Sequence, residues 1–421
     1  MTNETLNDPG VHLPWAGKIV SMEEVEDVLS SLWKMSADNL RTGANLRVRT
    51  SVLNLIICAP DVETAQQVSV ILRKLSSTHL SRVVILILDS SENRPTAITA
   101  WVTLRCFSVI SDLMRHCFEQ TTMLASGSSI RYVANIIQPL LKPDLPVYLW
   151  WIGDPPGQND PTFAGLVALS NRIIVDSTSF FSPEQDIRTL AALFQASSES
   201  ALSDLNWGRL TPWRQLTIQF FDVPEYRPYL TGVDSIEIEH AVAPLAMPMR
   251  TEQGDVSPNP TRALLLAGWL KARLGWTMVS KEYLDTASGT YHWIMERTAN
   301  LRATRSLTPM RSKTGKLGNI ASISIRPRVQ TEMRPGSICL VRLVSKLENK
   351  RATFTISRED DLNNVLTSVE LSHETRPKRT VSLTAENKED ELLRDELEIL
   401  GHDYLFEQTL LEVAEMLSED S

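Results

Sequence analysis

Unbroken apolar runs alternate with helical segments over the first half of the chain, and this alternation constrains the fold more than any other feature. Residues 51–59 (SVLNLIICA), 82–88 (RVVILIL) and 146–152 (PVYLWWI) have the composition of strands. They lack polar alternation, which is typical of strands covered on both faces in a parallel sheet. The same reading gives further strands at 99–108 and 172–176, and helices at 62–75, 129–141, 163–169 and 183–196.

Strands that alternate with helices predict an α/β N-terminal domain with a doubly wound, mostly parallel sheet. We place this domain at residues 21–200. Residues 1–20 are expected to form a flexible lead-in, because they are polar and carry Pro9, Gly10 and Pro14. Ser21 and Glu24 form a capping box that predicts a first helix over 22–37.

The second half has a different pattern. The Ser-rich stretch 197–204 indicates a domain boundary. A helix is predicted to start at Thr211, which can cap it, with Pro212 at the first helical position. A second long helix is expected at 259–276. Period-two strands follow without intervening helices, which predicts an α+β domain over 201–421 with an antiparallel sheet at 235–239, 291–297, 322–328, 337–343, 351–357 and 365–371. An amphipathic, acidic helix, bent at Gly401, closes this domain over 386–416.

The overall charge excludes several classes of protein. The chain has 421 residues with 42 Lys and Arg against 51 Asp and Glu, a net charge of -9, so the basic footprint of a nucleic-acid-binding protein is missing. Lys271 and Arg273 interrupt the best apolar run, so no membrane span is expected. The start of the chain lacks a secretory signal and the four cysteines lack C-x-x-C spacing, so we expect a cytoplasmic protein.

Catalytic and cofactor motifs are not found in the sequence. It contains no G-x-G-x-x-G, no G-x-x-x-x-G-K-[ST], no G-x-S-x-G and no H-E-x-x-H. Cys106, His116 and Cys117 are the one group that suggests a metal, but structural zinc normally uses two close pairs and ordinary burial of the cysteines is the alternative. We therefore expect no enzyme activity, no cofactor and no metal.

The first candidate site lies where the strand 146–152 runs into the turn Gly153-Asp154-Pro155-Pro156. Ligands and partners bind beyond the carboxyl ends of strands in open α/β sheets. Trp151 and Asp154 are therefore candidate binding residues. The alternative is that the two faces of this strand simply bury one Trp each under neighbouring helices.

The second candidate is the Trp-Arg segment, residues 204–214 (DLNWGRLTPWR). Large aromatic area beside forked Arg donors is the composition of protein-interface anchors. Trp207, Arg209, Trp213 and Arg214 are the candidate anchors. Because Arg also stacks on Trp, an internal tie between the two domains is the alternative.

The third candidate is the stretch 297–331, which has eight Lys or Arg and no acid. Such a stretch suits an acidic partner or a phosphate group, and its candidate contacts are Lys313, Lys316 and Arg326. A solvated loop without a partner is the alternative.

Three motifs carry a resemblance to a known family: WWIGDPP at 150–156, RIIVDS at 172–177 and WGRLTPWR at 207–214. With these motifs the chain resembles the glucose-6-phosphate dehydrogenase assembly protein family, OpcA, over residues 15–415. The resemblance implies a non-catalytic protein that binds glucose-6-phosphate dehydrogenase as a hetero-oligomer, favours its active oligomer and raises its activity. It also implies light-dark redox control through thioredoxin in cyanobacterial members. The widely spaced cysteines give that control no support here.

A second hypothesis is a sugar-phosphate-binding protein or enzyme. It would use a crevice at the carboxyl ends of the N-terminal strands, near Asp154 and Asp176.

Overall fold

The structure is a computed structural model of the chain. It describes residues 18–38, 46–49, 51–75, 81–91, 95–108, 114–157, 159–196, 199–243, 250–251, 254–255, 259–285, 289–297, 320–358, 364–372, 374–375, 378–383, 388–399 and 401–418. The chain divides into two compact units. The first comprises residues 1–152 and 159–173, and the second comprises 153–158 and 174–421.

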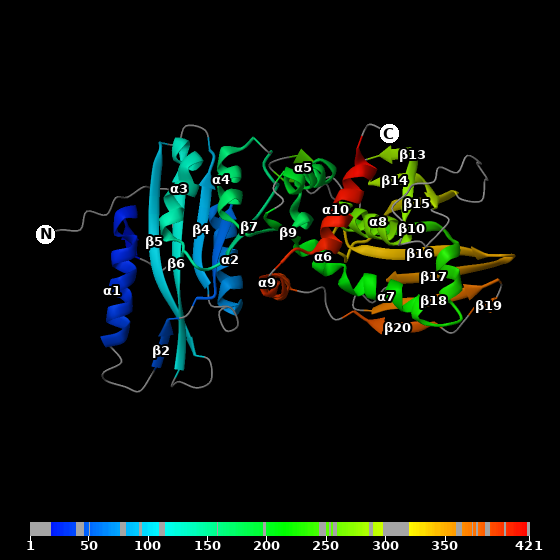
Figure 1. The fold of residues 1–421 in the computed structure, drawn as a ribbon, viewed down its shortest axis with the longest axis horizontal. Coiled ribbons are helices and arrows are strands. Elements are labelled where there is room, and N and C mark those ends of the chain that lie inside the picture. The colour runs from blue at the N-terminus through cyan, green and yellow to red at the C-terminus, as the bar shows by residue number, and fades with distance from the viewer. Residues whose placement is uncertain are drawn as a thin grey trace. The chain divides into compact units, whose positions relative to one another are not determined.

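The first unit is built on a mostly parallel sheet (Figure 1). Its strands run in the order β1-β5-β6-β4-β3-β7, followed by β8, which the division into units cuts after Ile173. Neighbours among β6, β4, β3 and β7 pair in parallel, whereas β5 is antiparallel to both β1 and β6. The strands are β1 Lys18–Val20, β2 Leu46–Arg49, β3 Leu53–Ala59, β4 Ser81–Asp89, β5 Ala97–Ser108, β6 Met114–Ser126, β7 Val147–Trp151 and β8 Arg172–Val175.

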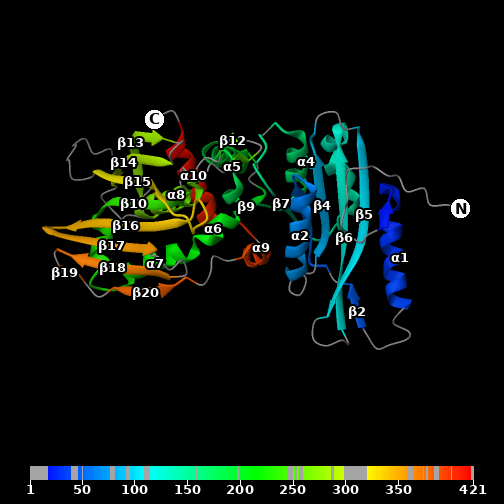
Figure 2. The same ribbon diagram turned by 180° about the vertical axis from the view of Figure 1, so that it is seen from behind.

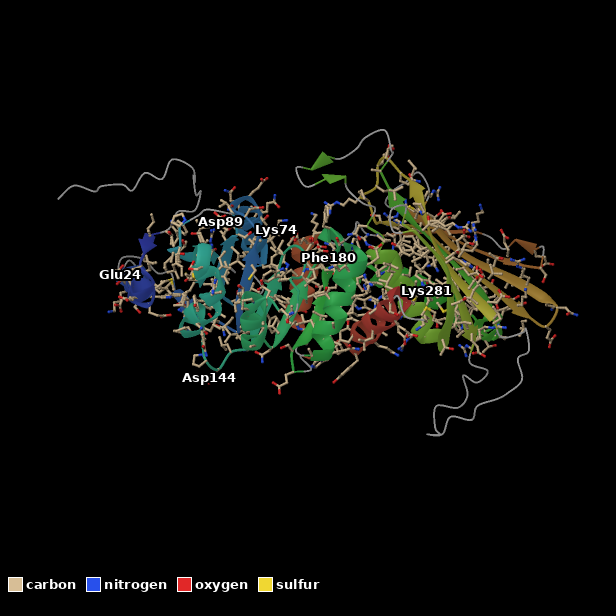
Figure 3. The ribbon with its side chains drawn as sticks, turned by 90° about the horizontal axis from the view of Figure 1, so that it is seen from above. Glu24, Lys74, Asp89, Asp144, Phe180 and Lys281 are labelled. Atoms are coloured by element: carbon tan, nitrogen blue, oxygen red, sulfur yellow. The ribbon has the colours of Figure 1, made fainter. Side chains whose placement is uncertain are left out.

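Helices follow the strands as the sequence predicted. Every residue of β3 is buried, which confirms that its apolar run is covered on both faces. The Asp61 carboxylate accepts from the Thr64 backbone N–H at 2.7 Å at the start of α2, and Lys74 in the last turn suits the helix dipole (Figure 3). The helices are α1 Val25–Asp38, α2 Val62–Leu75, α3 Val133–Ile137 and α4 Pro161–Leu169.

One predicted helix of this unit was wrong in part, and the strands β1, β2 and β6 were missed. Strand β1 lies within residues 1–20, the expected flexible lead-in, because it pairs with β5. The helix expected at 129–141 is broken into short 3₁₀ and α segments, with Pro139 in the last of them, Gln138–Leu140. Strand β6 was not predicted at all. Its centre carries the buried polar residues Glu119, Gln120, Thr121 and Thr122, which conceal its apolar character.

The second unit contains a mostly antiparallel sheet in the order β13-β14-β15-β10-β16-β17-β18-β19, with β20 beside β18 (Figures 1 and 2). Its one parallel pair among the described strands is β10 with β15. The strands are β10 Val233–Val242, β13 Trp276–Asp285, β14 Thr290–Arg297, β15 Ile320–Val329, β16 Ile338–Leu347, β17 Lys350–Arg358, β18 Asn364–Leu371, β19 Glu374–Thr375 and β20 Arg379–Ser382. A separate pair is formed by β11 Arg250–Thr251 and β12 Gly254–Asp255.

Helices pack on one face of this sheet. The Phe354 ring on β17 lies among rings that include Phe220 and Tyr229, and the Trp293 indole on β14 donates to the Met416 carbonyl at 2.9 Å. Lys271 is buried and pairs with Glu412 and Glu415 across two helices. The helices are α5 Pro183–Ala196, α6 Leu205–Arg209, α7 Thr211–Asp222, α8 Thr261–Leu274, α9 Glu389–Glu398 and α10 Tyr404–Leu417.

Three local predictions for this half need correction. The Ser-rich stretch contains a buried strand, β9 Ala201–Asp204. The helix predicted to 276 ends at Leu274, because Gly275 takes the left-handed conformation that closes a helix, and β13 follows at once. The closing segment is two helices, α9 and α10, separated near Gly401. The domain boundary at 200 stays a prediction.

Candidate functional site

The Trp-Arg segment forms a turn of helix, α6, that leads directly into α7. The Asp204 carboxylate caps α6 by accepting from the Asn206 N–H at 2.9 Å. Pro212 occupies the first turn of α7, as predicted, but Thr211 does not cap it, since the cap position is Leu210. The Thr211 hydroxyl accepts from the Arg214 guanidinium instead, at 2.9 Å.

Arg209 forms a two-pronged ion pair with Asp176, which follows β8. Its Nη1 and Nη2 donate to the two carboxylate oxygens at 2.7 and 2.8 Å. The two side chains are 6% and 13% exposed. Burial alone would lower the pKa of Arg209, but the charge and hydrogen bonds of Asp176 outweigh it and raise that pKa. The pair is a buried tie inside the second unit.

Asp204 lies beside this pair and is fully enclosed. Its carboxylate accepts from the Ser177 N–H at 3.0 Å and from the Ser177 hydroxyl at 2.5 Å. Burial, followed by the nearby charge of Asp176, raises the pKa of Asp204 to about 7, although its hydrogen bonds act in the other direction. The carboxyl group therefore titrates near neutral pH.

The network extends to the start of α8. The Arg262 guanidinium donates to the Asn206 side chain at 2.8 Å. The Asn259 amide donates to the Ser177 carbonyl at 3.0 Å. Polar groups buried in this way cost little only when they are all hydrogen-bonded, so the network fixes the Trp-Arg segment in one arrangement.

The Trp207 indole connects the segment to the end of the chain. Its Nε1 donates to the Asp403 carboxylate at 3.0 Å, and its ring lies 5.9 Å from the Phe406 ring. Asp403 also caps α10, since it accepts from the Phe406 N–H at 3.0 Å. The Arg214 guanidinium covers the other side of the Trp207 ring at 3.5 Å, and burial lowers the pKa of Arg214 to about 10 against the opposing charge of Asp403.

The predicted anchors are thus side chains of the interior. Trp207 is 3% exposed and Trp213 is 2% exposed, and the Arg358 guanidinium lies 5.7 Å from the Trp213 ring. In this conformation the two indoles offer almost no surface to a partner. The internal tie is therefore present, within the second unit, and direct contact of these four residues with a partner stays a prediction.

The remaining candidates lie elsewhere. Trp151 on β7 meets the Phe163 ring edge-on at 4.8 Å. The Asp154 carboxylate accepts from the Phe181 N–H at 2.7 Å. Arg326 on β15 is 62% exposed and pairs with Glu237 at 3.3 Å. Lys313 and Lys316 lie outside the described residues.

The fold brings two of the widely spaced cysteines, Cys106 and Cys117, to opposite positions on neighbouring strands. Cys58 and Cys339 are buried free thiols, and burial raises the pKa of Cys339 to about 11. The register of β5 with β6 places Cys106 opposite Cys117, and Cys117 is disulfide-bonded. No cluster of metal-ligating side chains occurs among the described residues.

Sequence reasoning missed the partners of the Trp-Arg segment. Asp403 is 196 positions from Trp207 in the chain, and no local signal connects them. The one usable signal was Asp204, an N-cap residue type placed directly before the helix.

The comparisons with known proteins bear on this segment directly. Residues 73–192 match the N-terminal domain model of the glucose-6-phosphate dehydrogenase subunit, OpcA, and residues 200–410 match its C-terminal domain model. The chain belongs to the OpcA family. The C-terminal match includes the whole Trp-Arg segment and both closing helices up to residue 410.

Two curated relatives of this OpcA chain come from cyanobacteria. The OxPP cycle protein OpcA of Synechocystis sp. is 36% identical over 167 residues, which are 40% of this chain and 31% of the relative. That of Nostoc punctiforme is 32% identical over 211 residues, 50% of this chain and 42% of the relative. The matched region thus spans less than half the length of these relatives.

Solved structures give only a weak likeness. A levoglucosan dehydrogenase in complex with NADH and L-sorbose aligns with 87% of this chain and 89% of its own, at 9% identity and a TM-score of 0.40. An apo scyllo-inositol dehydrogenase from Lactobacillus casei aligns at 9% identity and a TM-score of 0.37, over 88% of this chain and 89% of its own. Within the described ranges, no helix is long and apolar enough to cross a membrane.

Proposed function

We propose that this OpcA chain is a non-catalytic subunit that binds glucose-6-phosphate dehydrogenase, supports its active oligomer and raises its activity in the oxidative pentose phosphate pathway. The observation that carries the proposal is the match of both halves of the chain to the two domain models of the glucose-6-phosphate dehydrogenase subunit. The names of the curated relatives, which refer to the OxPP cycle, support it.

Activation of this kind requires differential binding. The chain must bind the active state of the dehydrogenase more tightly than the inactive state, because equal affinity for both states would shift nothing. A tenfold preference corresponds to about 1.4 kcal/mol of coupling free energy. A few well-packed contacts supply that amount.

The Trp-Arg segment serves this function through the helices it holds. Asp403 accepts from the Trp207 indole and caps α10 at the same time, so the segment fixes where α10 begins. At that point Tyr404 is 76% exposed and stacks on His402 at 5.7 Å. We expect the buried segment to act as a support for surface residues of this kind, and direct contact by its own side chains remains to be tested.

The two carboxylates of the sugar-phosphate hypothesis already have partners within the chain. Asp176 is held by Arg209 through both carboxylate oxygens, and Asp154 is held by the Phe181 N–H. A ligand at this place would have to displace a buried ion pair, which leaves an uncompensated charge behind.

The test combines binding with kinetics. The cognate dehydrogenase, this chain and their mixture are compared by size-exclusion chromatography, and the initial rate is measured at limiting glucose 6-phosphate. We expect co-elution and a higher rate in the mixture. Separate elution with an unchanged rate would overturn the proposal.

A thermal-shift measurement on the chain alone separates the two hypotheses. A ligand that binds only the folded state raises the apparent stability. We expect no shift with glucose 6-phosphate or 6-phosphogluconate. A saturable shift would favour the sugar-phosphate hypothesis.

A further inference from the structure

The sheet of the second unit has two unlike faces. On β17, Ala352, Phe354 and Ile356 are completely buried, whereas Thr353 and Thr355 between them are partly exposed. The helix contacts described above, through Phe354 and Trp293, come from the buried face. Because side chains alternate along a strand, the residues between them form a second face, which we call the outer face.

The strand registers define one row of this outer face across six strands. Antiparallel and parallel pairings link neighbours in turn from β14 to β18 (Figure 2). The row consists of His292, Ser324, Glu237, Arg342, Thr355 and Ser368. Half of its members are short hydroxyl residues, so the surface between the charged groups is flat.

The charges at the centre of the outer face are paired within it. Glu237 accepts from Arg342 at 2.6 Å and lies 3.3 Å from Arg326. Glu239 lies 3.5 Å from Arg328 in the next row. A surface that covered the centre of this face would bury these charges as pairs, which avoids the largest cost of burying ionic groups.

The size of the face matches a stable interface. Seven strands, from β13 to β18 through β10, at a spacing of about 4.8 Å give a width of about 29 Å. Eight residues at about 3.3 Å give a length of about 26 Å. The product is about 750 Å², close to the roughly 800 Å² that each partner buries in a standard interface.

The charge balance identifies the occupant. The chain as a whole is acidic, with 51 acids against 42 bases, so two copies repel each other over most of their surface. At the centre of the outer face Glu237 and Glu239 each have an Arg beside them, so the repulsion between two copies is weakest there. A twofold interface needs a patch that complements itself, and alternating Glu and Arg can satisfy that requirement.

We propose that the outer face of this sheet is a self-association surface, on which a second copy of the chain packs sheet against sheet. The proposal goes beyond the proposed function and does not depend on it. A chain that pairs through this face would present two dehydrogenase-binding surfaces in one assembly.

The test is the molar mass of the chain alone, without dehydrogenase, by sedimentation equilibrium over a hundredfold range of concentration. We expect a reversible monomer–dimer equilibrium. In Thr355→Glu and in Thr355→Lys we expect the dimer dissociation constant to rise at least tenfold. In a twofold dimer each substitution adds the same charge to both facing surfaces, and these charges repel each other. Ser324→Glu repeats the test on β15.

The matched control is Ile218→Glu. Ile218 lies on α7, a helix that packs on the other face of the sheet, and its side chain is 51% exposed. It should dimerise like the unmodified chain. Circular dichroism confirms that each variant is folded. A monomer at every concentration would overturn the proposal, and so would a dimer that survives all three outer-face substitutions.

Discussion

Removal of one partner from the buried ion pair between Arg209 and Asp176 should strongly destabilise the second unit. Arg209→Ala leaves Asp176 without its cation beside the buried Asp204, at sites where the two paired side chains are 6% and 13% exposed. Removal of one partner from a buried pair typically costs about 3–5 kcal/mol. We expect a loss of that size in the free energy of unfolding.

The assay is urea unfolding, followed by Trp fluorescence and circular dichroism. The matched control is Arg326→Ala, which also removes an Arg from an ion pair, but at a side chain that is 62% exposed. Exposed pairs contribute about 0–1 kcal/mol, so the control should unfold almost like the unmodified chain. Equal losses in the two variants would refute the reasoning from burial.

This prediction also changes how the Trp-Arg segment can be tested. Joint replacement of Arg209 and Arg214 by Ala looks, from sequence, like a way to remove two surface anchors without disturbing the fold. The structure shows that Arg209 holds a buried carboxylate and Arg214 covers the Trp207 ring. A loss of activation in that variant would therefore report a damaged fold as readily as a lost contact.

Three further predictions follow from the same structure. The unfolding free energy should fall by up to about 4 kcal/mol as pH rises from about 4 to about 7, because the raised pKa of Asp204 means that the folded state binds the extra proton in this window. Urea unfolding across that range should show a smaller fall for Asp204→Asn. An identical slope of unfolding free energy against pH in the two proteins would contradict this role of Asp204. Gly268→Ala should cost about 1–3 kcal/mol in thermal or urea unfolding, because the new methyl group would lie 2.5 Å from the Val413 side chain, whereas Gly401→Ala, with no atom within 4 Å, should be near neutral. Trp207→Phe should cost about 1–3 kcal/mol in urea unfolding, because it leaves the half-buried Asp403 without the indole donor; an unchanged midpoint would count against the role of this bond.

The local sequence pattern predicted most of the helices and strands. The apolar run of β3 and the 3.6-residue period of α2 are read from adjacent residues, and both elements lie where they were expected. The period-two segments of the second half likewise became β14, β15 and β17. In these elements the burial pattern and the local conformational preference of the residues agree, so the sequence alone is sufficient to predict them.

The missed strands are those in which distant partners override the local pattern. Glu119 on β6 accepts from the Trp33 indole at 2.6 Å, and Gln120 accepts from Arg105 at 2.7 Å. These bonds make a polar strand stable in the interior, and none of them is visible locally. Strand β13 is interrupted by register shifts between Met278 and Ser280 and between Lys281 and Tyr283, which break its alternation.

The candidate site shows the same limit. Composition correctly marked the Trp-Arg segment as unusual, but it could not distinguish an interface from an internal tie, since aromatic and Arg side chains serve both. The distinction came from Asp176 and Asp403, which the fold brings to Arg209 and Trp207. Long-range pairing of this kind is set by topology and not by spacing.

The proposed function requires that the chain binds and activates a dehydrogenase. The most direct measurement is a titration of this chain into a fixed amount of the cognate glucose-6-phosphate dehydrogenase, with the initial rate recorded at limiting glucose 6-phosphate. We expect a rate that rises and saturates at a defined molar ratio. A rate that stays flat at every ratio would contradict it.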